Sequence, residues 1–173
     1  MKKQIGVMGS CQDLEYSKEV EALAEAVGKE IARANCTLFF GAEKDLDSLS
    51  TAACRGAKKE GGLCVGVTYG KGKDVVEDCD VVVATGLERG GGRELVLALS
   101  CDAIIAISGG SGTLTELAIG YQANIPLIVL EDTGGWADKL VGEYLDARKR
   151  VKVVGAKTPK EAVEMAVRMA GKP

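Results

Sequence analysis

Short apolar runs alternate along the chain with longer segments in which apolar residues recur every three or four positions. The short runs are rich in β-branched residues and bounded by polar or glycine residues, a pattern typical of buried strands. The strands predicted in this way are Gln4 to Gly9, Thr37 to Gly41, Leu63 to Thr68, Val81 to Thr85, Ala103 to Ile107, Leu127 to Leu130 and Val151 to Gly155.

The segments between these runs show the spacing of amphipathic helices. Ser17 to Ala34 places Val20, Leu23, Ala24, Val27 and Ile31 on one face, as in a helix that lies on a sheet. A further short helix is predicted at Glu94 to Leu99. The sequence Thr-Pro-Lys-Glu at 158–161 opens the last helix with a cap residue, a proline at the first helical position and a capping-box glutamate.

Apolar strands that alternate with amphipathic helices imply a parallel sheet covered on both faces. We therefore predict a Rossmann-like, three-layer α/β fold with a mostly parallel sheet of about seven strands. The 173 residues suffice for one core, so we expect residues 1–173 to form a single domain. The glycine-rich piece Gly86 to Gly92 is interpreted as a loop within that domain.

Charge and hydropathy exclude several classes of partner. The net charge is −3 and no strongly basic run is present, so we expect neither nucleic acid nor a membrane surface as a partner. The apolar run Ile5 to Met8 is too short for a signal-peptide core, and Glu94 and Asp102 interrupt the best candidate for a membrane span. These features favour a cytoplasmic protein.

The chain has six cysteines without a CxxC pair and no histidine. A usual zinc site therefore cannot be completed, and we expect no bound metal and no cofactor. The absence of histidine also excludes Ser-His-Asp and Cys-His catalysis. Any catalysis would rest on carboxylates, Arg, Lys, Tyr, Cys or hydroxyl groups.

The stretch IIAISGGSGTLTEL, residues 104–117, places three glycines at a turn from a buried strand into a helix expected after Thr113. In an α/β protein such a turn lies at the carboxyl edge of the sheet, where backbone N–H groups and the helix N-terminus attract a phosphate. The alternative is that the glycines only make a tight turn. Gly9 and Ser10, at the end of the first strand, join the candidates. The candidate phosphate- and nucleotide-binding residues are Gly9, Ser10, Ser108, Gly109, Gly110, Ser111, Gly112 and Thr113.

The glycines match no standard nucleotide fingerprint. The loop lacks the GKS or GKT of a P-loop, so ATP hydrolysis is unsupported. The first turn, Gly9-Ser10-Cys11, is not GxGxxG, so dinucleotide binding is unsupported as well. A mononucleotide or sugar phosphate fits the pattern better.

Two charged residues near this loop have competing interpretations. Glu116 ends the capping-box pattern Thr-Leu-Thr-Glu at 113–116, in which it would only return to the cap N–H. Arg93 follows three glycines and opens a predicted helix, where a cation opposes the helix dipole by roughly 0.3–1 kcal/mol unless it grips an anion. The alternative for Arg93 is an ordinary surface position. Lys71, Lys73 and Arg89 are interpreted as solvated loop charges.

Arg93 together with Ser-Gly-Gly-Ser-Gly-Thr-Leu-Thr-Glu at 108–116 resembles the paired signature of the LOG, or lysine decarboxylase-like, family. That family has a PGGxGTxxE loop and an arginine one helix upstream. The likeness extends from IGVMGS near the start to TPKEAVEMA near the end, and lies nearest to a branch that also resembles molybdenum cofactor carrier proteins. The resemblance implies a Rossmann-like fold, a homodimer or higher homo-oligomer, and catalytic roles for Arg93 and Glu116.

For the hydrolase members, the resemblance implies cleavage of the N-glycosidic bond of a nucleoside 5′-monophosphate into base and ribose 5-phosphate. Glu116 would stabilise the oxocarbenium-like centre and orient water, Arg93 would hold the substrate, and the loop would hold its phosphate. The alternative is a carrier or binder, without enzymatic activity, of a phosphorylated ligand such as a molybdopterin-type cofactor.

The chain departs from the family pattern at several positions. Ser108 replaces the loop proline, and Glu94 replaces the lysine or asparagine usual after the arginine. The upstream glycine-rich loop becomes Gly41 to Ser50, with Glu43, Asp45 and Asp47. We expect acids in this loop to repel a phosphate and its side chains to crowd the approach.

Overall fold

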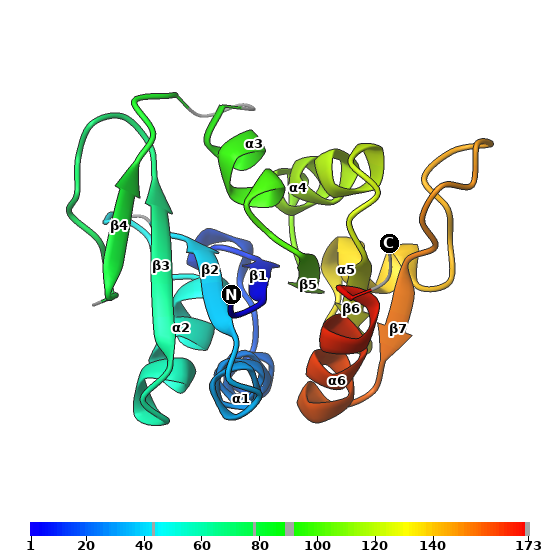
Figure 1. The fold of residues 1–173 in the computed structure, drawn as a ribbon, viewed down its shortest axis with the longest axis horizontal. Helices are drawn as coiled ribbons and strands as arrows, with labels where there is room; N and C mark the ends of the chain where they lie inside the picture. Colours follow the sequence, from blue (N-terminus) through cyan, green and yellow to red (C-terminus); the bar gives the residue numbers. More distant parts are fainter. Residues whose placement is uncertain (43, 78, 89–91, 172–173) are drawn as a thin grey trace.

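The structure is a computed structural model that describes residues 1–42, 44–77, 79–88 and 92–171. Its sheet contains the strands β1 (Gln4–Gly9), β2 (Thr37–Gly41), β3 (Leu63–Thr68), β4 (Val81–Ala84), β5 (Ala103–Ile107), β6 (Leu127–Leu130) and β7 (Val154–Ala156). All neighbouring strands pair in parallel, in the order β4-β3-β2-β1-β5-β6-β7. This arrangement confirms the predicted Rossmann-like α/β sheet (Figure 1).

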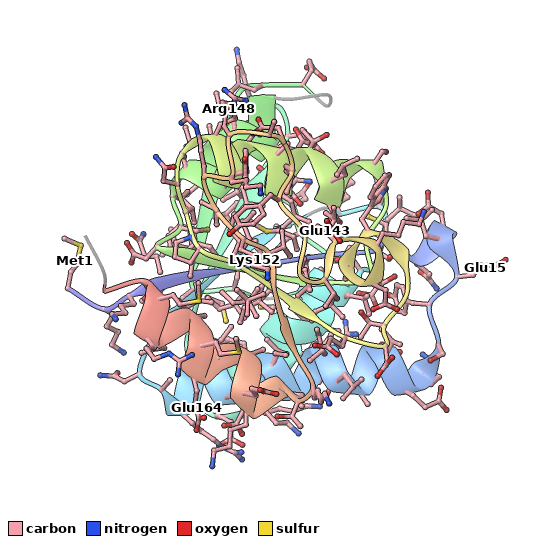
Figure 2. All side chains as sticks on the ribbon, turned by 90° about the vertical axis from the view of Figure 1, so that its right-hand side faces the viewer. Met1, Glu15, Glu143, Arg148, Lys152 and Glu164 are labelled. Atoms are coloured by element: carbon pink, nitrogen blue, oxygen red, sulfur yellow. The ribbon has the colours of Figure 1, made fainter. Side chains whose placement is uncertain are left out.

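Helices cover both faces of the sheet. They are α1 (Lys18–Arg33), α2 (Leu49–Lys59), α3 (Gly92–Leu99), α4 (Ser111–Gln122), α5 (Gly135–Leu140) and α6 (Pro159–Met169), with a short 3₁₀ helix η1 (Gln12–Leu14) after β1. One core cluster joins α1, α2 and α6 to the sheet, and the other joins α3, α4 and α5 to the opposite face. The three layers are visible from the side in Figure 2. Among the helices of the described residues, none combines the length and apolar character needed to cross a membrane.

The alternation of side chains along each strand explains the two clusters. On β5, Ile105 and Ile107 belong to the α1 side, whereas Ile104 and Ala106 belong to the α4 side. All four side chains are fully buried. Because both faces are covered, the strand is apolar at every position, which is the pattern that the sequence shows.

Helices α1 and α2 make an unusually close contact at two glycines. A Cβ atom added to Gly28 would lie 1.8 Å from the backbone oxygen of Ala53, and one added to Gly56 would lie 1.9 Å from the backbone oxygen of Glu25. The two helix backbones can approach so closely only because neither glycine has a side chain. This contact fixes α2, whose N-terminus faces the pocket described below.

The predicted last strand and the predicted start of α4 differ most from the structure, and one capping contact of α6 differs as well. The last strand is β7 at Val154–Ala156, because Val153 N donates instead to Glu143 O and Lys152 pairs antiparallel with Tyr144. Helix α4 begins at Ser111, before the expected start. At α6, Thr158 caps as predicted by accepting from Glu161 N, whereas the Glu161 carboxylate accepts from Lys157 N.

Candidate functional site

A pocket of about 370 Å³ lies at the carboxyl edge of the sheet. It opens where the chain order reverses between β1 and β5, the place at which ligands bind in open α/β sheets. It is lined by Gly9, Cys11, Asp13, Leu14, Gly41, Leu46, Ser48, Ser50, Tyr69, Arg93, Glu94, Gly110, Ser111, Gly112, Thr113, Thr115 and Glu116. The glycine-rich loop therefore meets Arg93 and Glu116 in one cavity.

The turn between β5 and α4 is held from the side of α5. Ser108 N donates to Thr133 Oγ1 at 2.8 Å, and Ala137 N donates to Ser108 O at 2.9 Å. Trp136 N donates to Gly109 O at 3.0 Å. Ser108 adopts φ 55° and Gly109 φ 102°, so the chain turns through the left-handed region at two successive residues. These bonds hold a backbone conformation that serine rarely adopts.

Ser10 supports the same turn from β1. Its Oγ accepts from Gly109 N at 2.8 Å and donates to Ser108 Oγ at 3.0 Å, and the hydroxyls of both serines are buried. The structure thus places Ser10, Ser108 and Gly109 beneath the pocket, where they shape the loop, and not among the lining residues. A direct contact of these three residues with a phosphate stays a prediction.

The first turn of α4 faces the pocket with its backbone amides. The first bond of the helix runs from Leu114 N to Gly110 O, so the N–H groups of Ser111, Gly112 and Thr113 precede the intrahelical ladder. Gly110 is the N-cap and has no side chain that could occupy these donors. The arrangement offers donors and the positive end of the helix dipole to an anion.

Arg93 and Glu116 form a buried ion pair inside the pocket. Arg93 Nη1 lies 2.9 Å from Glu116 Oε1, and the side chains are 8% and 7% exposed. Helix α4 begins at Ser111, so Glu116 lies in its second turn. The Glu116 carboxylate accepts a hydrogen bond from Arg93, whereas the alternative interpretation was a capping bond to the helix start. Arg93 is likewise buried and not an ordinary surface residue.

Gly41 and Tyr69 fix the other sides of the guanidinium group of Arg93. A Cβ atom at Gly41 would lie 2.5 Å from Arg93 Nη1, so a side chain at this position at the end of β2 would displace the guanidinium. Arg93 Cζ lies 4.5 Å from the centre of the Tyr69 ring, and Nη2 donates to Tyr69 Oη at 2.9 Å. The Tyr69 hydroxyl in turn donates to Glu94 Oε1.

The segment between β2 and α2 was expected to be an acidic loop that repels a phosphate, but two of its acids do not line the pocket. Asp45 is exposed and Asp47 is half-buried, and neither lines the pocket. Asp47 accepts from Thr51 and from Arg55 Nη1 at 3.1 Å. Burial raises the pKa of Asp47, but these hydrogen bonds outweigh it and hold the pKa below its usual value. Asp45 and Asp47 are therefore not part of the pocket wall, and the expected repulsion of a phosphate by this loop stays a prediction.

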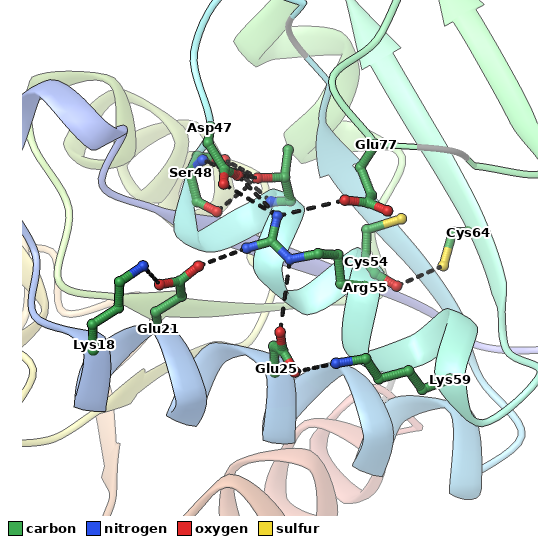
Figure 3. Close-up of polar contacts among 11 residues, drawn as sticks. Lys18, Glu21, Glu25, Asp47, Ser48, Cys54, Arg55, Lys59, Cys64 and Glu77 are labelled. Atoms are coloured by element: carbon green, nitrogen blue, oxygen red, sulfur yellow. Dashed lines mark hydrogen bonds and ion pairs between the residues drawn. The ribbon is translucent and has the colours of Figure 1, made fainter.

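Arg55 is the centre of the ion-pair network that fixes this segment, as Figure 3 shows. It contacts Glu21 at 2.8 Å, Glu25 at 3.7 Å, Asp47 at 3.1 Å and Glu77 at 3.5 Å. The network leaves Ser48, the N-cap of α2, and Ser50, in the first turn of α2, on the pocket wall. The predictions about Glu43 and Arg89 lie outside the described residues, as do Gly90 and Gly91.

Sequence reasoning missed several lining residues, chiefly Cys11, Asp13, Tyr69 and the two serines at the start of α2. Each follows the carboxyl end of a strand or begins the next helix, and these ends share one edge in a parallel sheet. The signal was therefore available, since the predicted ends of the first three strands were correct. Lys71 and Lys73 are exposed, in agreement with their interpretation as solvated charges.

The charged side chains among the described lining residues are Arg93, Asp13, Glu94 and Glu116. The carboxylates outnumber the cation, so positive potential comes mainly from Arg93 and the N-terminus of α4. An anion is therefore favoured at the α4 end of the pocket. Within the described residues, no group of three or more His, Cys, Asp or Glu residues is arranged to hold a metal ion.

The sheet order, the switch-point pocket and the glycine-rich helix start define a Rossmann-like protein with a small-molecule pocket. The chain belongs to the SLOG cluster4 family, whose model matches residues 2–163. This finding confirms the resemblance to LOG-like proteins. An uncharacterized protein of Archaeoglobus fulgidus is 37% identical over 120 residues, which are 69% of this chain and 74% of the relative.

Two solved structures are similar over nearly the whole chain. The molybdenum cofactor carrier protein from Chlamydomonas reinhardtii is 30% identical with a TM-score of 0.83, and the match covers 99% of this chain and 100% of that one. The molybdenum cofactor binding protein from the phototrophic bacterium Rippkaea orientalis is 29% identical with a TM-score of 0.81 and 98% coverage of both chains.

Proposed function

We propose that this protein binds a phosphorylated small molecule of the molybdopterin type and acts as its carrier. The observation that carries the proposal is the pocket at the switch point, where the free amides of α4 and the buried Arg93 meet. The similarity to two molybdenum cofactor proteins along nearly the entire chain supports the choice of ligand.

The chemistry of the site suits the phosphate of such a ligand at the N-terminus of α4. Backbone N–H groups of Ser111, Gly112 and Thr113 donate to the phosphate oxygens, and the helix dipole adds favourable potential. Ser111 is exposed and adds a hydroxyl. Arg93 lies beside this point and is already oriented by Glu116, so little side-chain freedom remains to be lost on binding.

The test is equilibrium binding of molybdopterin, measured anaerobically, to the wild-type protein and to Ser111→Asp. The introduced carboxylate occupies the place of the phosphate, so we expect affinity to fall at least about tenfold. The same carboxylate favours the helix start by roughly 0.3–1 kcal/mol, so thermal stability should not fall. Lost affinity with retained stability separates a binding role from a structural one.

Lys160→Gln is the matched control, because it also changes the net charge by −1 in the first turn of a helix, at α6. This variant should bind molybdopterin like the wild type. Equal affinity of Ser111→Asp and Lys160→Gln would contradict a phosphate site at α4. Failure of the wild-type protein to bind molybdopterin would contradict the proposed carrier.

Hydrolysis of a nucleoside 5′-monophosphate is the second candidate, and the buried pair of Arg93 and Glu116 in the pocket favours it. A carboxylate at Glu116 can stabilise an oxocarbenium-like centre and orient water. The assay is release of free base and ribose 5-phosphate from a panel of nucleoside monophosphates. Release that Glu116→Gln abolishes would establish a phosphoribohydrolase, and no release from any member would leave the carrier.

We also propose that a second copy of the chain covers the apolar face shared by α3 and α4, which gives the homodimer expected from the family. Leu95 is 46% and Leu99 54% exposed, beside Leu114, Ala118 and Ile119. The face adjoins the ligand pocket through Thr115, which lines both. A two-fold axis would let the same face cover itself.

Leu99→Glu tests this face, because it places a charge at the centre of the expected interface. We expect the wild type to run as a dimer and this variant as a monomer in size-exclusion chromatography with light scattering. Val76→Glu is the control, since Val76 is 38% exposed and lies outside the α3–α4 face. A monomeric wild type, or an unchanged dimer in Leu99→Glu, would contradict the proposal.

A further inference from the structure

The start of helix α2 is a second place where a backbone donor faces the pocket. The helix begins at Leu49, and its N-cap Ser48 and first-turn residue Ser50 line the cavity. The first amides of a helix need partners outside the helical ladder. Leu49 N donates to Ser10 O at 3.0 Å, and Thr51 N donates to Ser48 Oγ at 3.1 Å. The amide between these two, Ser50 N, remains for a ligand.

Ser50 itself is the observation that points to a ligand at this helix start. It is 6% exposed, and within the described residues neither its N–H group nor its hydroxyl has a hydrogen-bond partner. Polar groups buried to this extent are normally hydrogen-bonded, because a missing bond costs free energy. Since Ser50 lines the pocket, a ligand there can supply the acceptor. Two donors on one residue suit an oxygen atom that carries negative charge.

The acid at this helix start leaves the donors of Ser50 open. Asp47 precedes the N-cap, and its carboxylate accepts from Ser48 N at 2.8 Å and from Arg55 Nη1 at 3.1 Å (Figure 3). Asp47 does not line the pocket, and its carboxylate is paired with Arg55. The 11 residues of α2 add the positive end of a helix dipole, which favours an anion beside Ser50.

The starts of α2 and α4 flank the same strand end and are both held by Ser10. Ser10 O accepts from Leu49 N, and Ser10 Oγ accepts from Gly109 N. Helix α2 follows β2 and α4 follows β5, and β1 lies between these two strands in the sheet. Two strand spacings, about 10 Å, therefore separate the strand ends. A molecule that contacts both helix starts needs acceptor groups this far apart, and the two phosphates of a diphosphate, which share one oxygen, are too close together.

We propose that the start of α2, with Ser50, is a second oxyanion site, so that the pocket binds small molecules with an oxyanion at each end. The inference rests on the proposed function, because it supposes that a phosphate of the ligand lies at α4. Two classes of ligand meet the requirement. A metal-loaded molybdopterin carries metal-bound oxygens at the end opposite its phosphate, and a nucleoside 3′,5′-bisphosphate carries phosphates on two sides of its ribose.

The test compares a ligand that has one oxyanion with a ligand that has two, in two pairs, as equilibrium affinities measured anaerobically. The pairs are metal-free against molybdenum-loaded molybdopterin, and AMP against adenosine 3′,5′-bisphosphate. We expect the wild type to bind the second member of one pair on the order of tenfold more tightly than the first. The pair that shows this preference identifies the source of the second oxyanion. Ser50→Ala should lose much of the preference, because the hydroxyl donor is removed.

Ser50→Ala should be as stable as the wild type, because the hydroxyl has no partner within the described residues and alanine is the better helix former. Ser111→Ala is the matched control, since it removes a hydroxyl from the first turn of the other helix, α4. It should weaken both members of a pair alike and keep the ratio of their affinities.

Equal affinities within both pairs for the wild type, or a preference that Ser50→Ala keeps in full, would overturn the inference and leave the carrier intact. Failure to bind either form of molybdopterin would overturn the carrier, and the nucleotide pair would still decide whether the start of α2 binds an oxyanion. Failure of the wild type to bind any of the four ligands would overturn both.

Discussion

Replacing Arg93 by methionine is expected to destabilise the fold by about 3–5 kcal/mol, because it removes the guanidinium from a buried ion pair with Glu116. Arg93 is 6% exposed and contacts Glu116 directly, with Glu94 nearby on the other side. Methionine fills much of the arginine volume, so lost packing contributes little to the effect. Urea denaturation at neutral pH measures the difference from the wild type.

The double variant Arg93→Met with Glu116→Gln identifies the cause of that loss. When the carboxylate is removed together with the guanidinium, most of the lost stability should return, since no unpaired charge remains at this contact. The single variant Glu116→Gln completes the double-mutant cycle. If the two single losses simply add in the double variant, the ion pair contributes no coupling and Arg93 stabilises the fold by other contacts.

Replacing Gly28 by alanine is expected to cost more than about 3 kcal/mol or to prevent folding, although alanine favours helices by about 1 kcal/mol over glycine. The added methyl group would overlap the backbone oxygen of Ala53 at 1.8 Å, and a backbone atom cannot move aside as a side chain can. Helices α1 and α2 would have to separate. Thermal denaturation, or the soluble yield if no folded protein forms, measures the effect.

Gly112→Ala is the matched control for stability, because Gly112 is also helical and nothing lies within 4 Å of an added Cβ atom. Its stability should equal or exceed that of the wild type, since alanine has the better helix propensity. Gly56→Ala should be as damaging as Gly28→Ala, because its Cβ atom would meet Glu25 O at 1.9 Å. A tolerated Gly28→Ala would show that the interhelical contact can open at little cost.

The strands were predictable because both faces of the sheet are covered. Five of the proposed runs, among them Gln4 to Gly9 and Ala103 to Ile107, match the observed bounds, since a run that is apolar at every position has clear ends. The last strand was predicted to begin too early, because Val153 is apolar but does not belong to the parallel ladder. It is buried against the α3–α4–α5 side, and its backbone bonds to Glu143 and Gly142. Hydropathy indicates that a residue is buried, but it does not indicate with which backbone groups that residue forms hydrogen bonds.

The candidate site was only partly visible in the sequence. The loop, Arg93 and Glu116 were found from spacing and resemblance, and they meet in one pocket. The capping-box pattern at 113–116 indicated the wrong helix start, because α4 begins at Ser111. Glycine-rich sequences do not mark the first helical residue well. The arrangement of Asp47 could not be foreseen, because its partner Arg55 comes from the second turn of the following helix and also binds two glutamates of α1. Such contacts depend on tertiary packing.

The turn before α4 is braced by Ser10, Thr133 and the start of α5, so we expect its backbone to stay unchanged when a ligand binds. Binding then requires no ordering of this loop, and association should follow a single bimolecular phase in a stopped-flow experiment. The dissociation rate is set by the contacts themselves. For the proposed carrier, this rigidity predicts release by competition, in which a recipient that makes more contacts with the ligand removes it from a pocket that is already open.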